Sequence, residues 1–409
     1  MTHLPTPGAG NEVAWVAEHL GHLTCDVPAR SGRFVGTQAA ADSALATLDI
    51  TGYAKRRNEV EPVRRRGATA LSPFVRYGLL TLPQLWDAVG DAPSSDRQKF
   101  RDELLWQEYA RHLYARLGTA MAAPLRYDPL PGNTVVEIDV EPWDRTMACV
   151  DTNVTELERD GWLVNQTRMW LASHWTVRSG ADWRVGEDRF FRHLLDGSRA
   201  ANRLGWQWTI GAGTGKPYGF SRWQVEKRAP GRCSSCVHRN ACPIESWPPE
   251  RTLDAVPATP LLDHDPHPSR TGGPRVAAGD SRADVVWMTA ESMGDDDPAL
   301  AAHPDLPVLF VFDEPLLGGL QLSGKRLVFL VERLAELASQ RTVEVHLGTP
   351  ADVLAGSIPA VTFAPVPGFR RISSRLPDVQ LHPWPWLRIP GPGTVRSFTG
   401  WVRSSLRSR

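Results

Sequence analysis

The chain has 409 residues, and its 46 Lys and Arg side chains balance its 46 Asp and Glu side chains, so the formal net charge is zero. A neutral chain has no global attraction to nucleic acid, and any DNA affinity must come from a local basic patch. Two Arg-rich runs, 55–66 and 222–239, are candidates for such a patch. The composition, 42% hydrophobic and 22% charged, is that of globular domains. No run approaches the ~18 apolar residues of a membrane span and no secretory signal opens the chain, so we expect a cytoplasmic protein without membrane association.

The first 80 residues predict short helices and one candidate phosphate site. Helical patterns cover 11–21 and 36–48, and Tyr53 and Arg57 follow in a Y-x-x-R-R run. After them, Ser72 is followed directly by proline, which marks a helix start whose free N–H groups suit a phosphate. Simple capping of the helix explains the same residues.

A strong helix is predicted over 97–118. Phe100, Glu103 and Gln107 fall on one face of it, with Trp106 beside them. The alternative is an amphipathic surface helix, because Glu is a good helix former.

The stretch 165–208 carries the densest pattern in the chain. Asn165, Arg168, Met169 and Ala172 share one helix face, which therefore combines an amide, a cation and a thioether. A core face would be apolar throughout, and a surface face would have no reason to include Met. This mixture indicates a binding surface.

The end of the same stretch adds a turn and two tryptophans. Asp196 opens the turn, Asn202 lies six residues later, and Trp206 and Trp208 close the stretch. A helix over 146–160 precedes it.

The five cysteines are clustered. Cys233, Cys236 and Cys242 have a compact spacing followed by proline, which suits an iron–sulfur cluster but supplies only three of the four thiolates. Cys149, at the start of the 146–160 helix, is the candidate for the fourth. By spacing alone tetrahedral zinc is equally compatible. Cys25 is left over, and we expect a buried free thiol.

The last third of the chain has a different pattern. A Pro-, Gly- and Asp-rich segment without a period indicates a linker. Beyond it, apolar runs and one helix predict a βαβ unit in a parallel sheet, without a G-x-G-x-x-G fingerprint. The strands are expected at Val285–Met288, Val308–Phe312, Val343–Leu347 and Ala360–Phe363, and the helix at Gly324–Ser339.

The expected fold class is therefore α plus α/β. An all-helical domain occupies 1–248, the linker 249–281, and a small Rossmann-like parallel-sheet domain 282–409.

Four motifs in order resemble the flavin-binding core of the cryptochrome/photolyase family. They are N-x-x-R-M at 165–169, D-W-R-x-G-E at 182–187, D-G-S-x-x-x-N at 196–202 and G-W-Q-W at 205–208. The resemblance implies a helical FAD domain and an antenna-type α/β domain. Relatives carry the α/β domain first, so here the chain looks circularly permuted. The R-D-L-R run at the start of that domain is absent, and the antenna pigment is left open.

The resemblance also implies the flavin contacts. Arg168 and Asp196 should form an ion pair over the isoalloxazine ring, and Asn202 should face its N5 atom. Gln107 stands where relatives have Arg, and Ser198 where they have a second Asp. The expected FAD-binding residues are Tyr53, Arg57, Thr69, Leu71, Ser72, Phe100, Glu103, Gln107, Asn165, Arg168, Asp196, Ser198 and Asn202.

Within this family the cysteines and the K-P-Y segment at 216–218 resemble the iron–sulfur bacterial branch. That likeness favours a [4Fe–4S] cluster over zinc. Its ligands would be Cys149, Cys233, Cys236 and Cys242.

Photolyases flip a damaged dinucleotide into a pocket beside the flavin. Enzymes of (6-4) photoproducts tend to carry His at the positions of Asn165 and Met169, so the resemblance implies a cyclobutane pyrimidine dimer photolyase. Trp206 and Trp183 match an electron-hopping chain, with Trp143 as a candidate third member. The expected catalytic residues are Glu103, Trp106, Met169, Asn202, Trp206, Trp183 and Trp208.

We expect a monomer that binds damaged DNA, single- or double-stranded. The alternatives are a blue-light photoreceptor without repair activity, a (6-4) photolyase, and a flavoprotein that passes electrons to a partner.

Overall fold

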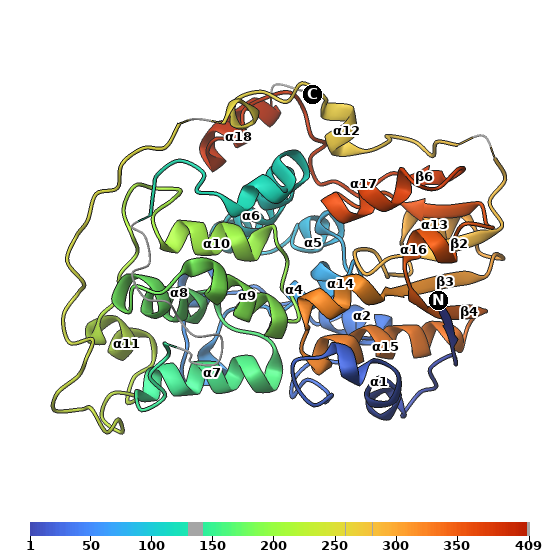
Figure 1. The fold of residues 1–409 in the computed structure, drawn as a ribbon. Helices are drawn as coiled ribbons and strands as arrows, with labels where there is room; N and C mark the ends of the chain where they lie inside the picture. Colours follow the sequence, from blue (N-terminus) through green and yellow to red (C-terminus); the bar gives the residue numbers. More distant parts are fainter. Residues whose placement is uncertain (130–141, 258, 280, 407–409) are drawn as a thin grey trace.

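The computed structural model describes residues 1–129, 142–257, 259–279 and 281–406. A helical half and a half built around a sheet lie side by side (Figure 1). The predicted fold class, helices together with a parallel-sheet α/β part, is confirmed. Within the described residues, no helix is both long and apolar enough to cross a membrane.

The helical half follows the sequence patterns closely. Its longest helix, α6, starts three residues before the predicted range, and α8 begins at the predicted Asn165. Its helices are α3 (Tyr53–Arg56), α4 (Ser72–Arg76), α5 (Leu82–Ala88), α6 (Ser94–Leu117), α7 (Ala148–Asp160), α8 (Asn165–Ser173), α9 (Trp183–His193), α10 (Ala201–Thr209) and α11 (Arg222–Arg228).

The other half contains a six-stranded sheet in the order β1-β4-β3-β2-β5-β6. Every pairing is parallel except that of β1 with β4. The four predicted strands and the predicted helix are confirmed within one or two residues. The elements are β1 (Thr2–Leu4), β2 (Val285–Met288), α13 (Pro298–Ala302), β3 (Val308–Asp313), α14 (Glu314–Leu320), α15 (Gly324–Ala338), β4 (Val343–Gly348), α16 (Pro350–Val353), β5 (Pro359–Thr362), α17 (Pro367–Ser373) and β6 (Gln380–His382). The last helix, α18 (Phe398–Leu406), was predicted to belong to the α/β domain, but it lies against α6 of the helical half.

The N-terminal residues lie with the sheet rather than with the helical half to which their position in the sequence assigned them. Leu4 of β1 stands opposite Val345 of β4, and α1 (Glu12–Leu20) packs on α15. A strand of three residues is too short to show a period, which is why the pattern did not reveal it. The nearby α2 (Gln38–Ala46) also contacts this half, because Glu336 of α15 accepts from the N–H groups at its start.

The segment predicted as a linker, 249–281, is packed against the protein. Leu253 and Leu262 are buried, and α12 (Pro268–Gly272) lies within it. The buried Asp265 lies 3.4 Å from the guanidinium of Arg116 on α6. A Pro- and Gly-rich composition shows irregular backbone, but it does not show what that backbone contacts.

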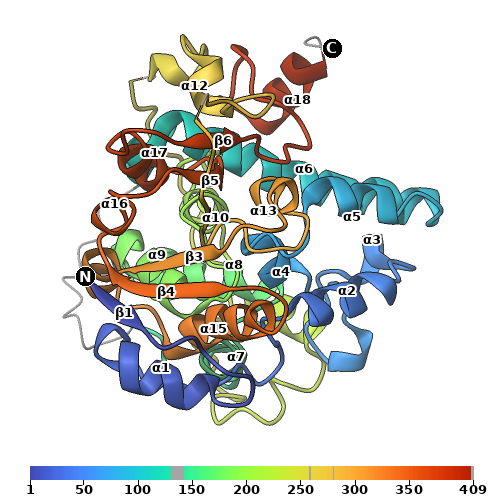
Figure 2. The ribbon, with the colours of Figure 1, turned by 90° about the vertical axis from the view of Figure 1, so that its right-hand side faces the viewer.

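Helices cover both faces of the sheet (Figure 2), with α15 and α1 on one side and α16 and α17 on the other. Successive side chains of β2 point to opposite faces of the sheet, and both faces are covered by helices. Val286 belongs to the core shared with α15, and Trp287 stacks on Phe369 of α17 with ring centroids 5.7 Å apart.

A buried cation on α15 joins the two halves. Arg326 donates to the hydroxyl of Tyr77 at 3.2 Å and to the carbonyl of Gly197 at 3.1 Å, and these bonds fix α15 against the helical half. A second buried cation, Arg333, donates from Nε to the carbonyl of Met293 at 2.8 Å and holds α15 to the segment that follows β2. Each guanidinium is at most 2% exposed, so its hydrogen bonds offset the cost of burying the charge.

Gly36 marks the closest approach of the N-terminal segment to α15. A Cβ added there would lie 2.0 Å from the carbonyl oxygen of Phe329, which is backbone and cannot rotate away. We expect Gly36→Ala to lower the free energy of unfolding by about 2–3 kcal/mol, measured by urea denaturation. Gly8→Ala, where a Cβ would meet no atom within 4 Å, is the control and should change little. Equal effects at both positions would contradict the packing described here.

Candidate functional site

The predicted ion pair between Arg168 and Asp196 is present. The guanidinium of Arg168, on α8, donates twice to the carboxylate, at 3.0 and 2.7 Å, and once to the carbonyl of Leu163 at 2.9 Å. The two side chains are 23% and 5% exposed. A bidentate pair with so little solvent contact holds a cation in one place.

The same carboxylate connects to the start of α4. Ser72 donates its hydroxyl to Asp196 at 2.5 Å and accepts from Nε1 of Trp162 at 3.0 Å. The turn at 196 and the helix start at 72, which belong to two separate sequence motifs, are thus in one hydrogen-bonded network.

The loop before Ser72 has an unusual backbone. Ala70 has a φ of 58°, in the left-handed region, and Leu71 follows in the right-handed helical region with φ −81° and ψ −10°. A left-handed conformation costs a non-glycine residue about 1–2 kcal/mol. Successive residues of opposite hand turn their N–H groups to one side and make a cradle for an anion. The predicted phosphate-binding residue Thr69 is half-buried in this loop.

A second set of predicted residues comes together between α3 and α6. Tyr53 is buried edge-to-face against Phe100, with ring centroids 5.2 Å apart. Glu103 pairs with Arg57 at 3.3 Å and with Lys99 at 3.0 Å. Burial raises the pKa of the Tyr53 phenol, which stays neutral at any working pH.

Asn202 is bound by Glu187 of α9. Its Nδ2 donates to both the carbonyl and Oε1 of Glu187, each at 3.0 Å. Glu187 is 1% exposed and also pairs with Arg199 and Arg203. The sequence analysis included Glu187 in a motif but gave it no role. Nothing in the sequence spacing indicates that its carboxylate binds Arg199, Asn202 and Arg203.

The other predicted residues differ in exposure. Asn165 and Gln107, predicted to bind the cofactor, are exposed, and Leu71 is buried, whereas the predicted catalytic residue Met169 is half-buried. Ser198 accepts at 3.0 Å from the N–H of Ala201, the first residue of α10.

Two tryptophans of the predicted site are exposed. Trp106 on α6 is 38% exposed and Trp208 on α10 is 39% exposed. Trp208 also contacts Tyr218, with ring centroids 5.3 Å apart. Open indole faces on neighbouring helices are the kind of surface on which unstacked bases are bound.

The other tryptophans form a buried row. Trp206 lies 6.4 Å from Trp175, and Trp175 lies 4.9 Å from Trp143, measured between ring centroids. Trp183 is buried too, but the guanidinium of Arg184 lies over its ring at 4.8 Å. The sequence analysis missed Trp175, whose position in a π-helical turn after α8 falls between motifs.

The predicted fourth cysteine joins the other three. Cys149 in the first turn of α7 lines one small cavity, partly open to solvent, together with Cys233, Cys236 and Cys242. The cavity also contains Met147 and a ring of basic side chains. These are Arg222, Arg232, His238 and Arg239.

The four thiols influence one another. Burial, and then the neighbouring thiols, raises the pKa of Cys149 to about 12. Burial raises the pKa of Cys233 to about 11. Without a metal Cys149 and Cys233 are neutral thiols, and a metal that binds them must displace their protons.

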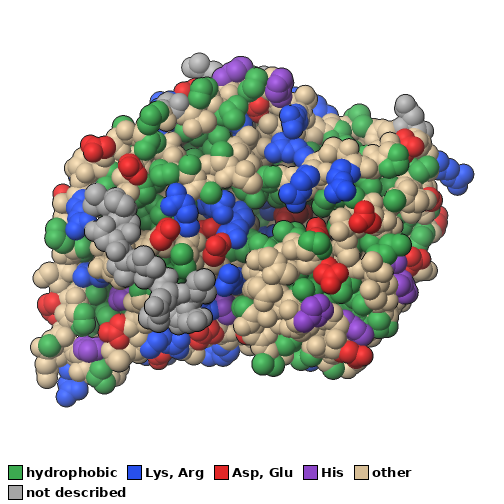
Figure 3. All heavy atoms as spheres, viewed as in Figure 1, with side chains coloured by type: hydrophobic (Ala, Val, Ile, Leu, Met, Phe, Trp, Pro, Cys, Tyr) green, Lys and Arg blue, Asp and Glu red, His purple; other side chains and the backbone are tan. Residues whose placement is uncertain are grey.

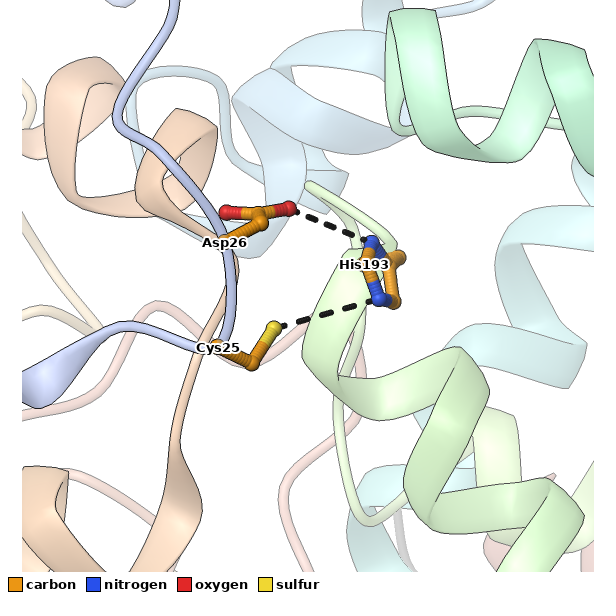
Figure 4. Close-up of side chains that lie close together, drawn as sticks. All are labelled: Cys25, Asp26 and His193. Atoms are coloured by element: carbon orange, nitrogen blue, oxygen red, sulfur yellow. Dashed lines mark hydrogen bonds and ion pairs between the residues drawn. The ribbon is translucent and has the colours of Figure 1, made fainter. Parts of the chain in front are cut away.

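A separate group contains Cys25, Asp26 and His193 (Figure 4). The sulfur of Cys25 lies 3.9 Å from Nε2 of His193, and a carboxylate oxygen of Asp26 lies 3.7 Å from Nδ1. Lys325 lies 3.5 Å from the same Nδ1 and would repel a metal ion there. Burial and the surrounding cations hold the pKa of His193 down to about 2, so the imidazole is neutral. Cys25 is exposed, and the prediction of a buried thiol is wrong.

One face of the molecule is basic at its centre. Lys and Arg side chains gather around a hollow where the two halves meet (Figure 3). The helices α10 and α17 lie on either side of this region in Figure 1.

Residues 100–235 match the family described as the FAD binding domain of DNA photolyase. The chain is 30% identical over 220 residues to a deoxyribodipyrimidine photo-lyase of Thermus thermophilus, which covers 51% of this chain and 50% of the relative. It is 29% identical over 230 residues to the same-named protein of Vibrio cholerae, which covers 52% and 47%. The chain thus spans about half the length of these curated relatives.

Solved structures give a weaker likeness. A cryptochrome from Synechocystis is 21% identical with a TM-score of 0.44, over 49% of this chain and 45% of that one. A bacterial class III photolyase from Agrobacterium tumefaciens is 24% identical with a TM-score of 0.38, over 50% and 41%. The match over residues 100–235 and the photo-lyase relatives thus make the helical part of this chain similar to the FAD binding domain of photolyases.

Proposed function

We propose that the protein is an FAD-dependent, light-driven photolyase that repairs cyclobutane pyrimidine dimers in DNA. One observation carries the proposal. The segment that matches a photolyase FAD-binding domain opens in α6, the helix on which Glu103 is followed three residues later by the exposed ring of Trp106. We further propose that it acts in the cytoplasm as a monomer.

The residues present fit FAD. The cradle around Ala70 suits the pyrophosphate, since its N–H groups can bind an anion without a side chain. The fixed guanidinium of Arg168 would stabilise negative charge on a reduced isoalloxazine ring, and Asp196 keeps that cation in position. When bound, FAD supplies light absorption and the electron that a photolyase passes to its lesion.

Asn202 keeps the role of an N5 contact only through its carbonyl oxygen, because its Nδ2 is held by Glu187. We propose that Glu187 fixes this amide in one orientation. An amide held in this way can bond the ring without readily donating a proton to it.

The row Trp206, Trp175 and Trp143 replaces the proposed route through Trp183. Adjacent rings in contact can pass electrons in short steps, and all three are at most 3% exposed. All three rings belong to the core against which Cys149 and Cys233 pack.

We propose that the four cysteines hold a [4Fe–4S] cluster, as in the iron–sulfur bacterial branch. Tetrahedral zinc would bring its thiolates to about 3.8 Å from one another. Among the described residues, the group whose ligand atoms lie within 4.8 Å of each other is Cys25, Asp26 and His193, not the four cysteines. A wider spacing supports a cluster, and the basic side chains around the cavity suit its net negative charge.

We also propose that the α/β half corresponds to the antenna domain of relatives in a circularly permuted position. In support, β2 to β6 follow the helical half in the sequence. We propose no antenna pigment for this half.

In the deciding experiment, purified protein is mixed with a single-stranded oligonucleotide that carries one cyclobutane thymine dimer, and the mixture is illuminated. We expect light-dependent loss of the dimer and none in the dark. A parallel arm with a (6-4) photoproduct identifies a (6-4) enzyme. Flavin photoreduction without loss of either lesion would instead indicate a photoreceptor and overturn the proposal.

A further inference from the structure

The last helix of the chain contributes an aromatic ring to the proposed DNA site. Phe398, the first residue of α18, stacks on Trp106 with ring centroids 3.9 Å apart and an interplanar angle of 8°. Trp106 is nevertheless 38% exposed. A parallel ring at this distance covers one indole face, so the exposed area belongs to the opposite face and the edges.

The ring of Phe398 is held in place by the helix around it. Trp401, one turn later, is 2% exposed and donates from Nε1 to Nδ1 of His112 at 3.0 Å. His112 in turn donates from Nε2 to the carbonyl of Arg388 at 2.8 Å, which fixes its tautomer. The rings of Phe398 and Trp401 both contact Tyr109 on α6, at 5.8 and 5.6 Å.

We propose that Phe398 is a positioning residue of a base-binding surface: it holds the indole of Trp106 in one plane so that the open face can stack on an unpaired pyrimidine base. This inference rests on the proposed function and extends its substrate site to the C-terminal helix. A free tryptophan loses side-chain freedom when a base binds. A tryptophan that is already stacked on another ring is ordered before the base arrives. Binding of the base then has no entropy cost for ordering this side chain, and its affinity is higher.

An opposite role is possible for the same geometry and has the opposite consequence. If Phe398 occupied the place of the base, it would compete with DNA, and its removal would tighten binding. The sign of the effect therefore decides between the two roles.

The test measures binding of the holoprotein to fluorescent single strands, one of plain oligo(dT) and one with a single thymine dimer. Phe398→Ala should weaken binding to both strands by about 3- to 10-fold, the effect of one side chain left to be ordered on binding. Phe398→Tyr keeps the flat ring and should restore binding. Phe398→Leu fills the space against Tyr109 and Trp401 without a flat ring, and should remain weak although the fold is intact. Thr399→Ala, at the exposed next position, is the matched control.

A double-mutant cycle separates positioning from general damage. In a Trp106→Ala background, Phe398→Ala should have no further effect, because the two residues act through one stack. An unchanged or tighter affinity of Phe398→Ala in the native background, or an equal loss in the Trp106→Ala background, would overturn the inference. Equal affinity of the native protein for both strands would count against dimer repair, whereas the oligo(dT) series would still decide the role of Phe398.

Discussion

Cys149→Ser is expected to lose bound iron and acid-labile sulfide, together with the broad visible absorption of an iron–sulfur protein. Cys149 is the one cysteine of the cavity that lies outside the 233–242 segment, and it is mostly buried beside the other thiols. A serine hydroxyl is a poor replacement for a thiolate toward iron. Iron and sulfide content per chain, with the absorption spectrum, measure the outcome.

Cys25→Ser is the matched control for this prediction. Cys25 is exposed and lies beside His193 rather than in the cavity, so the variant should keep its iron. Full iron content in Cys149→Ser would remove Cys149 from the ligand set. One zinc ion per chain in the native protein would replace the cluster by a tetrahedral zinc site.

Asp196→Ala is expected to prevent stable FAD binding and to destabilise the FAD-free protein by about 3 kcal/mol. The substitution leaves the half-buried guanidinium of Arg168 and the hydroxyl of Ser72 without their shared partner. Breaking a buried pair costs about 3–5 kcal/mol. The lower value applies here, because Arg168 is 23% exposed and water can solvate part of the charge. Urea unfolding of flavin-free protein isolates this effect from loss of the cofactor.

The control for Asp196 is a pair on the surface. Asp263 and Arg396 are 52% and 41% exposed and also form a two-bond pair. Asp263→Asn should leave both the flavin content and the unfolding midpoint unchanged, since exposed pairs contribute little. If Asp196→Ala retains FAD and unfolds like Asp263→Asn, the pair has no role in a flavin site.

Much of the architecture could be predicted from the sequence. The strands of the α/β half are continuous apolar runs, and α15 has its leucines at helical spacing. The residue pattern of each element therefore predicts whether it is a strand or a helix. The grouping of the four cysteines was equally predictable, because cysteines are rare and their spacing is informative. The pair between Arg168 and Asp196 followed from two motifs that the family resemblance joined.

Contacts between distant segments could not be predicted in the same way. Nothing in the sequence indicates that Glu187 binds Asn202, or that the tryptophan in contact with Trp206 is Trp175. The first contact depends on how α9 and α10 cross, and the second on how the π-helical turn after α8 meets α10, and periodicity fixes neither. The stack of Phe398 on Trp106 joins residues almost 300 positions apart and is likewise invisible in the sequence.

The pairing of β1 with β4 has a consequence for synthesis of the chain. Strand β1, which contains Leu4, can pair with β4 only after Val345 has been synthesised, about 340 residues later. At roughly 5–20 residues per second this delay is on the order of 20–70 s. The nascent polypeptide can assemble its helices during that interval, while the apolar side of α1 has no partner and is open to ribosome-associated chaperones.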